Sequence, residues 1–351
     1  MIYKLGELFC GAGGLAYGAV NADIGTDSKI VHEWAVDSNK DACQTYRHNI
    51  CKDDNAESVI CADVRSLNLD NLPAIDAFAF GFPCNDFSAI GRRKGFDGKF
   101  GSLYKYGINV LERFQPQFFF AENVANLINI DKGNAYKQIL SDMQSAGYKV
   151  FPHLYKFEEY GIPQTRHRII FIGIRKDLPF EFKPPSTIPF KNADISVKTA
   201  LTKPPINKNA FNHELPAHSP KTIEQLKYIK PGRTAFNTDL PEHLRLKPKK
   251  SFYHTKYLRL EPNKPCKTIC ASSGNPFYHY EENRTLTNRE RARVQSFPDD
   301  FKFFGSREKV QSQIGMAVPC RGAKIIFESI LKTFDGIDYD SVPCKIFKYM
   351  R

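Results

Sequence analysis

The chemistry that this chain could perform is concentrated in short segments, and the first is the glycine-rich turn FCGAGG at residues 9–14. An apolar segment precedes this turn and a helical one follows it. Glycines let the main chain turn tightly and let a ligand approach the backbone closely. Because a buried strand leads into the turn, a nucleoside ligand is favoured, although a dinucleotide site or a plain packing turn uses similar residues.

Two carboxylates follow neighbouring apolar segments. Asp37 ends the segment at 29–37, and Asp63 follows a third apolar segment at 59–61. A nucleoside-binding α/β fold places a carboxylate at such a strand end, where it accepts hydrogen bonds from both ribose hydroxyls. One acid there is commonly just solvated, but two beside a glycine turn favour a binding site.

A cysteine turn, GFPCNDFS at 81–88, comes directly after the apolar segment at 75–80. Cys84 is therefore expected at the carboxyl edge of a sheet, where ligands of such folds bind. A thiol there could act as a nucleophile, and the ordinary alternative is an inert buried cysteine. Glycines and basic residues at 91–101 suit a lid that touches phosphates.

Three more side chains are expected at the same edge. Glu122 ends the segment QFFFAE, and Arg166 and Arg168 lie at alternate positions where another strand begins. Alternate residues of a strand point to one side, so both arginines favour contacts with an anion or a base edge over plain solvation.

The elements that position these residues follow from apolar patterning. Buried strands are predicted at 3–9, 29–37, 75–80, 117–122 and 168–175, with helices at 14–22, 39–48 and 102–114. This alternation is typical of an open parallel α/β sheet. Helices are also predicted at 286–297, with Thr287 as its cap, and at 323–334, an amphipathic helix expected to pack back on the sheet.

Composition limits the class of protein. The formal charge is +12, which favours a polyanionic partner, nucleic acid before anionic membrane. No apolar run approaches the roughly 20 residues of a spanning helix, and no export signal is recognisable, so a cytoplasmic protein is expected. The 9 cysteines include no Cys-x-x-Cys pair, which argues against a disulfide framework and a zinc site. We therefore expect no metal.

Six segments in order resemble the DNA cytosine-5 methyltransferase family of bacterial and phage restriction-modification systems. They are FCGAGG, GFPCNDFS, ENV at 122–124, QTRHR at 164–168, RERARVQSFPDDF at 289–301 and QIGMAV at 313–318. One such match could be chance, but six in the family's order indicate a resemblance over nearly the whole chain.

The resemblance implies a Rossmann-like S-adenosylmethionine-dependent methyltransferase sheet with helices on both faces, plus a smaller, loop-rich target-recognition domain. Proline and lysine mark a boundary near 185. The implied domains are a catalytic and cofactor-binding domain at 1–185, the target-recognition domain at 186–284, a connecting segment at 285–315, and a return to the catalytic domain at 316–351.

The resemblance also assigns roles to residues. Cys84 would add to carbon 6 of a flipped-out cytosine, Glu122 and Arg166 would stabilise the base, and carbon 5 would take the methyl group of S-adenosylmethionine, leaving S-adenosylhomocysteine. The implied cofactor residues are Phe9, Gly11, Ala12, Gly14, Asp37, Ser38, Asp63, Val64, Pro83, Leu103 and Met316. The implied residues on double-stranded DNA are Ser88, Arg92, Arg168, Thr268, Ser272 and Asn275. By residue type alone, Arg259 and Lys264 are further candidates. A monomer with a cognate restriction endonuclease is expected.

Two positions depart from the family pattern. Asn85 stands where glutamine usually follows the nucleophile, and Met316 stands where QxGNxV has asparagine. Methionine cannot supply the amide's hydrogen bonds, so we expect weaker cofactor binding or arginine positioning. Three alternatives stay open: a catalytically impaired DNA-binding protein, a tRNA cytosine-5 methyltransferase and, for the glycine turn alone, a dinucleotide oxidoreductase.

Overall fold

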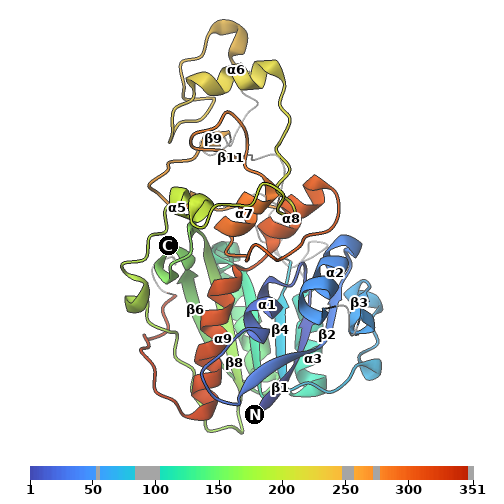
Figure 1. The fold of residues 1–351 in the computed structure, drawn as a ribbon. Coiled ribbons are helices and arrows are strands. Elements are labelled where there is room, and N and C mark those ends of the chain that lie inside the picture. Colours follow the sequence, from blue (N-terminus) through green and yellow to red (C-terminus); the bar gives the residue numbers. More distant parts are fainter. Residues whose placement is uncertain (53–55, 84–102, 247–256, 272–276, 347–351) are drawn as a thin grey trace. The chain divides into compact units, whose positions relative to one another are not determined.

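The computed structural model describes residues 1–52, 56–83, 103–246, 257–271 and 277–346. The chain divides into two compact units (Figure 1). Unit 1 comprises Met1–Phe157, His167–Pro189 and Cys320–Arg351, and unit 2 comprises Glu158–Arg166 and Phe190–Pro319. The chain therefore enters unit 2 twice. The functional domain boundaries expected from the sequence stay predictions.

A seven-stranded sheet forms the centre of unit 1, in the order β3-β2-β1-β4-β5-β8-β6. Its strands are β1 (Ile2–Leu8), β2 (Lys29–Asp37), β3 (Val59–Cys61), β4 (Ala77–Gly81), β5 (Phe118–Val124), β6 (Tyr148–Lys156) and β8 (His167–Arg175). Each of the five predicted strands is present. The edge strand β6 was not predicted, because its alternation is interrupted by Pro152, a residue that sheets tolerate mainly at edges.

The strand directions correct one expectation. Strands β1 to β5 are parallel as predicted, but β8 runs antiparallel to both of its neighbours, β5 and β6. Only residues 157–166 connect β6 to β8. A parallel crossover usually needs a dozen or more residues and a helix, so this short connection reverses the strand.

The phenylalanines of β5 show how the sheet is covered on both faces. Phe118 and Phe120 pack on Phe334 and Phe327 of α9 (Cys320–Asp335), with ring centroids 5.4 and 5.0 Å apart. Phe119 points to the opposite face, because successive strand residues alternate, and it shares a buried cluster there with Ile108 and Ile139 of two other helices. Helices therefore lie on both faces, and the prediction that the last helix packs on the sheet is confirmed.

The remaining helices of unit 1 are short; the first three follow the strands that they were predicted to follow, and the fourth was not predicted. They are α1 (Gly14–Val20), α2 (Lys40–Tyr46), α3 (Tyr104–Phe114) and α4 (Asn134–Ser145). Gly18 lets α1 lie directly against α9, since a Cβ atom at this position would stand 2.6 Å from the Cβ of Ala323. None of the helices in the described ranges is long and apolar enough to span a membrane.

Unit 2 is loop-rich, as the composition of its sequence predicted. Its helices are α5 (Val197–Thr202), α6 (Pro220–Tyr228), α7 (Asn288–Val294) and α8 (Arg307–Met316). Its strands are two-residue pairs, β7 (Gln164–Thr165) with β10 (Cys266–Lys267), and β9 (Leu258–Arg259) with β11 (Phe277–Tyr278). Thr287 caps α7 within a full capping box with Glu290, which confirms the predicted cap.

Short helical segments connect these elements within the described residues. They are the π turn Arg47–Cys51 and the 3₁₀ turns Ala56–Ser58, Val64–Ser66, Leu69–Asn71, Ala125–Gly133, Phe157–Tyr160, Ile188–Phe190 and Glu242–Leu244.

Candidate active site

The glycine turn is tied to the end of the neighbouring strand. Gly11 adopts a φ of 53°, in the left-handed region that favours glycine, and its N–H donates to Asp37 Oδ2 at 2.9 Å. Asp37 Oδ1 accepts from the N–H of Asn39 at 2.8 Å. A Cβ atom at Gly11 would meet no described residue within 4 Å, so these residues leave space beside the turn. The turn therefore has room for a ligand that approaches its backbone.

Asp37 can still accept further hydrogen bonds. Burial raises the pKa of Asp37, and the backbone N–H groups of Asn39, Gly11 and Ser38 act in the opposite direction. Two carboxylate oxygens offer about four lone-pair sites, of which the described backbone donors fill only part. The arrangement fits a ligand with hydroxyl donors, such as a ribose.

Several apolar residues predicted for the cofactor pocket gather in one cluster. Val64 and Leu103 are buried in it together with Phe82, and Phe9 packs against it. Ala12 and Gly14 are also buried, whereas Ser38 is exposed and Pro83 is half-buried. Asp63 Oδ1 accepts from Arg65 Nε at 2.9 Å, so this carboxylate is engaged at the surface. The residues fit a bound nucleoside, with Asp63 turned to its arginine neighbour.

The cysteine turn begins where β4 ends, beside β5. Gly81 is paired with Glu122 across the two strands, and a Cβ at Gly81 would lie 3.4 Å from Glu122 Oε2. Asn123, which is fully buried, donates from Nδ2 to the carbonyl oxygen of Phe82 at 3.0 Å. The sequence did not single out Asn123. Cys84, Asn85, Ser88 and Arg92 lie outside the described residues, as do Ser272 and Asn275.

Glu122 forms an ion pair with Arg168. Arg168 Nε lies 2.7 Å from Glu122 Oε1, and only 12% and 11% of the two side chains are exposed. Arg168 Nη1 also donates to the carbonyl oxygen of His167 at 2.8 Å. A nearly buried carboxylate and guanidinium are thus held together at the carboxyl end of β5, next to the start of the cysteine turn.

Arg166, two residues earlier, is engaged entirely differently. Its side chain is 1% exposed and lies in unit 2. Nη1 donates to Ile269 O at 3.1 Å, and Nη2 donates to Gly315 O at 3.0 Å and Ala317 O at 2.9 Å. Met316 stands between the last two carbonyl groups, and its own side chain is 52% exposed. Backbone groups, and not the side chain at position 316, therefore hold this guanidinium.

Neighbouring polar side chains hold the segment at 164–166 against the same part of unit 2 as Arg166 does. Gln164 Oε1 accepts from the N–H of Ile269 at 3.0 Å, and its Nε2 donates to the side chain of Gln295. Thr268 donates from its hydroxyl to Thr165 O at 2.6 Å. Hydrogen bonds therefore connect the segment from Gln164 to Arg166 with residues around 269, 295 and 316 of unit 2.

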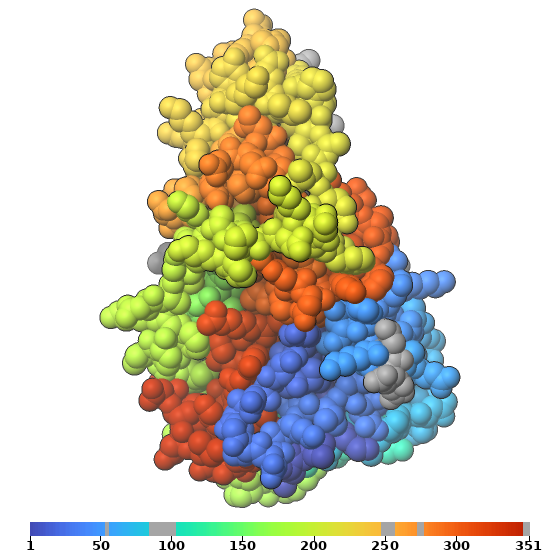
Figure 2. Space-filling view, in the orientation of Figure 1, coloured from blue at the N-terminus to red at the C-terminus, as the bar shows by residue number. Residues whose placement is uncertain are grey.

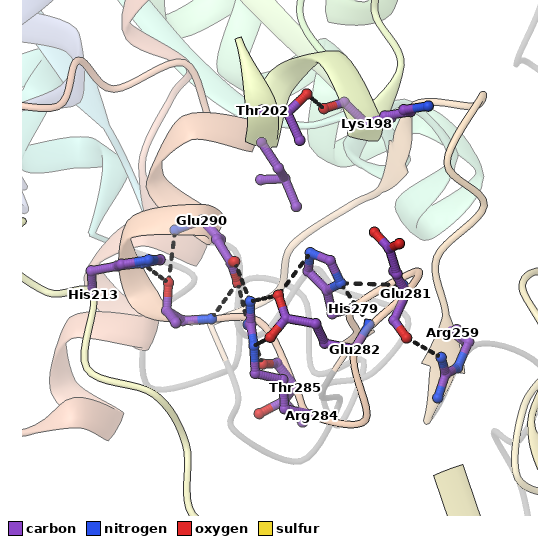
Figure 3. A network of polar contacts seen from close by, with 12 residues as sticks. Lys198, Thr202, His213, Arg259, His279, Glu281, Glu282, Arg284, Thr285 and Glu290 are labelled. Atoms are coloured by element: carbon purple, nitrogen blue, oxygen red, sulfur yellow. Dashed lines mark hydrogen bonds and ion pairs between the residues drawn. The ribbon is translucent and has the colours of Figure 1, made fainter. Parts of the chain in front are cut away.

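A buried polar network surrounds the start of α7 (Figure 3). Arg284 binds Glu290 through both Nη atoms, at 2.8 and 2.7 Å, and also pairs with Glu282. His279 Nδ1 accepts from the N–H groups of Glu281 and Glu282, and burial lowers the pKa of His279. The sequence did not reveal this network, because its polar residues follow no regular spacing along the chain.

Arg259 has a structural role within unit 2. It is 5% exposed and donates to Leu226 O at 2.7 Å, Asn283 Oδ1 at 2.7 Å and Glu281 O at 3.2 Å. These contacts occupy a guanidinium that residue type alone had suggested for DNA. Lys264 is 65% exposed and pairs with Glu261.

Comparisons with known proteins agree with these observations. The family described as C-5 cytosine-specific DNA methylase matches residues 3–332. The chain is similar to the Type II methyltransferase M.BbvI of Brevibacillus brevis, with 48% identity over 98% of this chain and 95% of that protein. It is 37% identical to the Type II methyltransferase M.NgoFVII of Neisseria gonorrhoeae, over 97% of this chain and 89% of the relative.

Solved structures show the same fold. A putative DNA modification methyltransferase encoded within an E. coli prophage superimposes with a TM-score of 0.72 at 23% identity, covering 95% of this chain and 99% of that one. Spodoptera frugiperda DNMT2 superimposes with a TM-score of 0.62 at 16% identity, covering 95% and 99%. The dinucleotide oxidoreductase alternative is thus set aside, and the predicted resemblance is confirmed: the chain belongs to the C-5 cytosine-specific DNA methylase family.

Proposed function

We propose that this enzyme methylates carbon 5 of one cytosine within a specific duplex sequence, with Cys84 as its nucleophile. Cys84 directly follows Pro83 in the sequence, two residues after Phe82, and Gly81 at the end of β4 is paired with Glu122 on β5. Asn123 supports this arrangement, because its hydrogen bond to Phe82 O joins the end of β5 to the backbone two residues before the thiol.

The proposed chemistry follows from the poor nucleophilicity of cytosine carbon 5. Addition of the Cys84 thiolate to carbon 6 makes carbon 5 electron-rich. Negative charge then develops toward ring nitrogen 3, where the carboxyl group of Glu122 hydrogen-bonds the base and a guanidinium stabilises the anion. After methyl transfer to carbon 5, a base removes the proton from that carbon and the Cys84 thiolate leaves carbon 6, which restores the aromatic ring. Since the ring is stacked inside a duplex, the enzyme first swings the nucleotide out, at a cost of a few kcal/mol.

We assign the base-side guanidinium to Arg168 in place of Arg166. The observation that supports this assignment is the 2.7 Å ion pair between Arg168 and Glu122. When the cytosine enters, Glu122 and Arg168 each exchange their mutual contact for a contact with a polar group of the base. Arg166, whose Nη atoms hold three backbone carbonyl groups, is proposed as a positioning residue.

S-adenosylmethionine is the proposed methyl donor, and when bound it supplies a methyl group on a positively charged sulfur. Asp37 would accept the ribose hydroxyls, because its two oxygens are held in place by Gly11 and Asn39. Phe9, Val64 and Leu103 would enclose the adenine from the apolar cluster that they share. Ala12, Gly14, Ser38, Asp63, Pro83 and Met316 complete the proposed set.

The proposed partners are double-stranded DNA and a restriction endonuclease of the same specificity. The two relatives named above both carry the name Type II methyltransferase, which supports this proposal. Ser88, Arg92, Ser272 and Asn275 remain proposed DNA contacts, while Thr268 has its hydroxyl engaged by Thr165. A monomer in the cytoplasm remains a prediction.

The decisive experiment is bisulfite sequencing of duplex DNA incubated with the enzyme and S-adenosylmethionine. We expect protection of one cytosine in one short sequence, and loss of that protection in Cys84→Ser. Cys344→Ser, a half-buried thiol after α9, serves as the matched control and retains activity. Methylation by Cys84→Ser would move the nucleophile elsewhere, and DNA binding without methylation by the wild type would favour the impaired binding protein. Methylation of tRNA alone would favour the third alternative.

A further inference from the structure

A chain of polar side chains lies beside the glycine turn in unit 1, and the proposed chemistry does not use it. Its members are Glu7 of β1, Tyr46 at the end of α2, His32 of β2, and Ser58 in the 3₁₀ turn before β3. Glu7 and Tyr46 are fully buried. Burying polar groups is costly unless they are hydrogen-bonded, and here each one bonds the next.

The hydrogen bonds of this chain run in one direction. Tyr46 donates from its hydroxyl to Glu7 Oε2 at 3.1 Å. Because the tyrosine proton is used there, His32 donates from Nδ1 to the Tyr46 oxygen, over 3.1 Å. His32 Nε2 then accepts from the hydroxyl of Ser58 at 2.7 Å. Tyr46 therefore joins β1 to β2, and through His32 it is also connected to the segment before β3.

Every member of the chain favours its neutral form. Burial raises the pKa of Glu7 well above its usual value; the hydrogen bond from Tyr46 acts against this, and the charge of Asp37 adds to it. Burial lowers the pKa of His32 to about 4 and raises the pKa of Tyr46 well above its usual value. The chain therefore keeps its geometry without placing a second negative charge beside Asp37.

Tyr46 also touches the glycine turn directly. Gly13 adopts a φ of 87°, and a Cβ atom built on it would stand 3.0 Å from Cδ2 of Tyr46. The ring thus lies against the backbone of the turn, while Gly11 in the same turn donates to Asp37. After the turn, α1 packs on α9, so that the blue N-terminal surface adjoins the red surface of α9 in Figure 2. Asp37, Tyr46 and α9 therefore hold the turn from different elements.

We propose that Tyr46 is a positioning residue for the cofactor: its bonds to Glu7 and His32 fix the glycine turn in the form that binds S-adenosylmethionine. This inference rests on the proposed cofactor site at the turn and Asp37. Without the hydroxyl, a buried carboxyl loses its donor and His32 Nδ1 loses its acceptor. Both groups can find new partners only if β1 or α2 shifts, and the turn lies between these two elements.

Tyr46→Phe tests this role, and Tyr148→Phe is the matched control. Tyr148 of β6 is equally buried, and its hydroxyl donates to Pro116 O at 2.9 Å. Each variant loses one buried hydroxyl, so both should lower the Tm to a similar extent. We expect only Tyr46→Phe to weaken binding of S-adenosylmethionine to the full-length protein, by about tenfold, because only there does the unsatisfied group adjoin the turn. Titration calorimetry measures this affinity.

Methylation kinetics give a second readout that lost stability alone would not change. For Tyr46→Phe we expect a higher KM for S-adenosylmethionine and a nearly unchanged kcat, because saturating cofactor orders the turn again. His32→Phe keeps a ring beside Tyr46 but removes the bond to its oxygen, so it should weaken cofactor binding in the same direction. If Tyr46→Phe does not fold, the affinity of His32→Phe decides.

The inference is overturned if Tyr46→Phe binds the cofactor as tightly as the wild type does. It is also overturned if Tyr148→Phe loses as much affinity, since the loss would then follow stability and not position. Failure of the wild type to bind S-adenosylmethionine would instead contradict the proposed cofactor itself, and this inference with it. The wild-type titration therefore reports on the proposed function, and the ratio of affinities reports on Tyr46.

Discussion

Two arginines separated by one residue show how far residue type alone leads. Arg166 and Arg168 share a residue type and were predicted to point to one side. In the structure, Arg168 faces the carboxylate of Glu122, and Arg166 faces three carbonyl oxygens. Because guanidinium binds several planar acceptors at once, it suits both tasks, and sequence could not assign them. The partners come from residues more than a hundred positions away in one case.

Lysine substitutions separate the two roles. Arg166→Lys leaves at least one carbonyl group without its donor, so we expect it to lower the free energy of unfolding by about 2–3 kcal/mol. Arg168→Lys keeps a cation beside Glu122 but removes the planar donor set, so we expect methylation to fall by about a hundredfold with a nearly unchanged Tm. Calorimetry and incorporation of labelled methyl groups measure the two effects. The opposite pattern would return the base-side role to Arg166.

At Met316, the side chain and the neighbouring backbone have separate roles. The carbonyl groups on either side of it hold Arg166, so Met316→Asn should leave the Tm unchanged. Its exposed side chain cannot accept or donate as an amide does. We therefore expect Met316→Asn to bind S-adenosylmethionine more tightly and to turn over faster. Titration calorimetry with the cofactor tests this, and equal affinities would show that methionine weakens nothing.

At the scale of elements, the strands were the easiest features to predict. Their apolar runs, such as the three phenylalanines of β5, are long and bounded by turn residues. Patterning does not reveal direction, however, and the reversal of β8 follows from the length of the connection to β6. The same connection carries Gln164 and Arg166 into unit 2, which no local signal announces.

The edge strand β6 also carries a titratable contact that should make stability depend on pH. His153 is 7% exposed, and its Nδ1 accepts from the N–H of Lys345 at 3.0 Å. Burial, followed by the charge of Lys345, lowers the pKa of His153 to about 4. In the unfolded chain its pKa is about 6.5, so the unfolded state binds the extra proton first. This contribution is complete above pH 6.5 and is lost as the pH falls toward 4.

His153→Gln tests this linkage, because an amide oxygen can accept from Lys345 but does not titrate. We expect the wild type to lose up to about 3 kcal/mol more than the variant between pH 7 and pH 4. Urea unfolding at intermediate pH values measures the difference. Parallel stability curves for the two proteins would show that His153 is not the titrating group.

At the scale of the whole molecule, sequence reasoning reached the family and most of the catalytic unit. Six motifs in order were sufficient for that: four of them adjoin strands β1, β4, β5 and β8 of the sheet, and the other two begin in α7 and α8 of unit 2. The interior of unit 2 was out of reach, because its short strands have no period and its buried arginines look like surface residues. Arg259, Arg284 and Arg289 are all buried, and only tertiary contacts distinguish them from cations available to DNA.

The cations that do reach solvent should govern DNA affinity as a whole. With a net charge of +12, the chain releases counterions when it binds, and each neutralised phosphate contributes about −0.9 to the slope of log affinity against log salt. We expect a slope of about −5 or steeper. Fluorescence anisotropy with a labelled duplex between low and physiological salt gives this value.

One lysine pair makes that expectation specific. Lys264 in unit 2 is 65% exposed and pairs with Glu261, while Lys4 at the start of β1 is 52% exposed and pairs with Glu33. Lys4 lies near the amino end of β1, whereas the proposed site lies at the carboxyl ends of the parallel strands, so Lys4 should not contact DNA. We expect Lys264→Gln to reduce the magnitude of the slope by about one, and Lys4→Gln to leave it unchanged. Equal reductions would mean that net charge alone, and not a defined surface of unit 2, attracts the duplex.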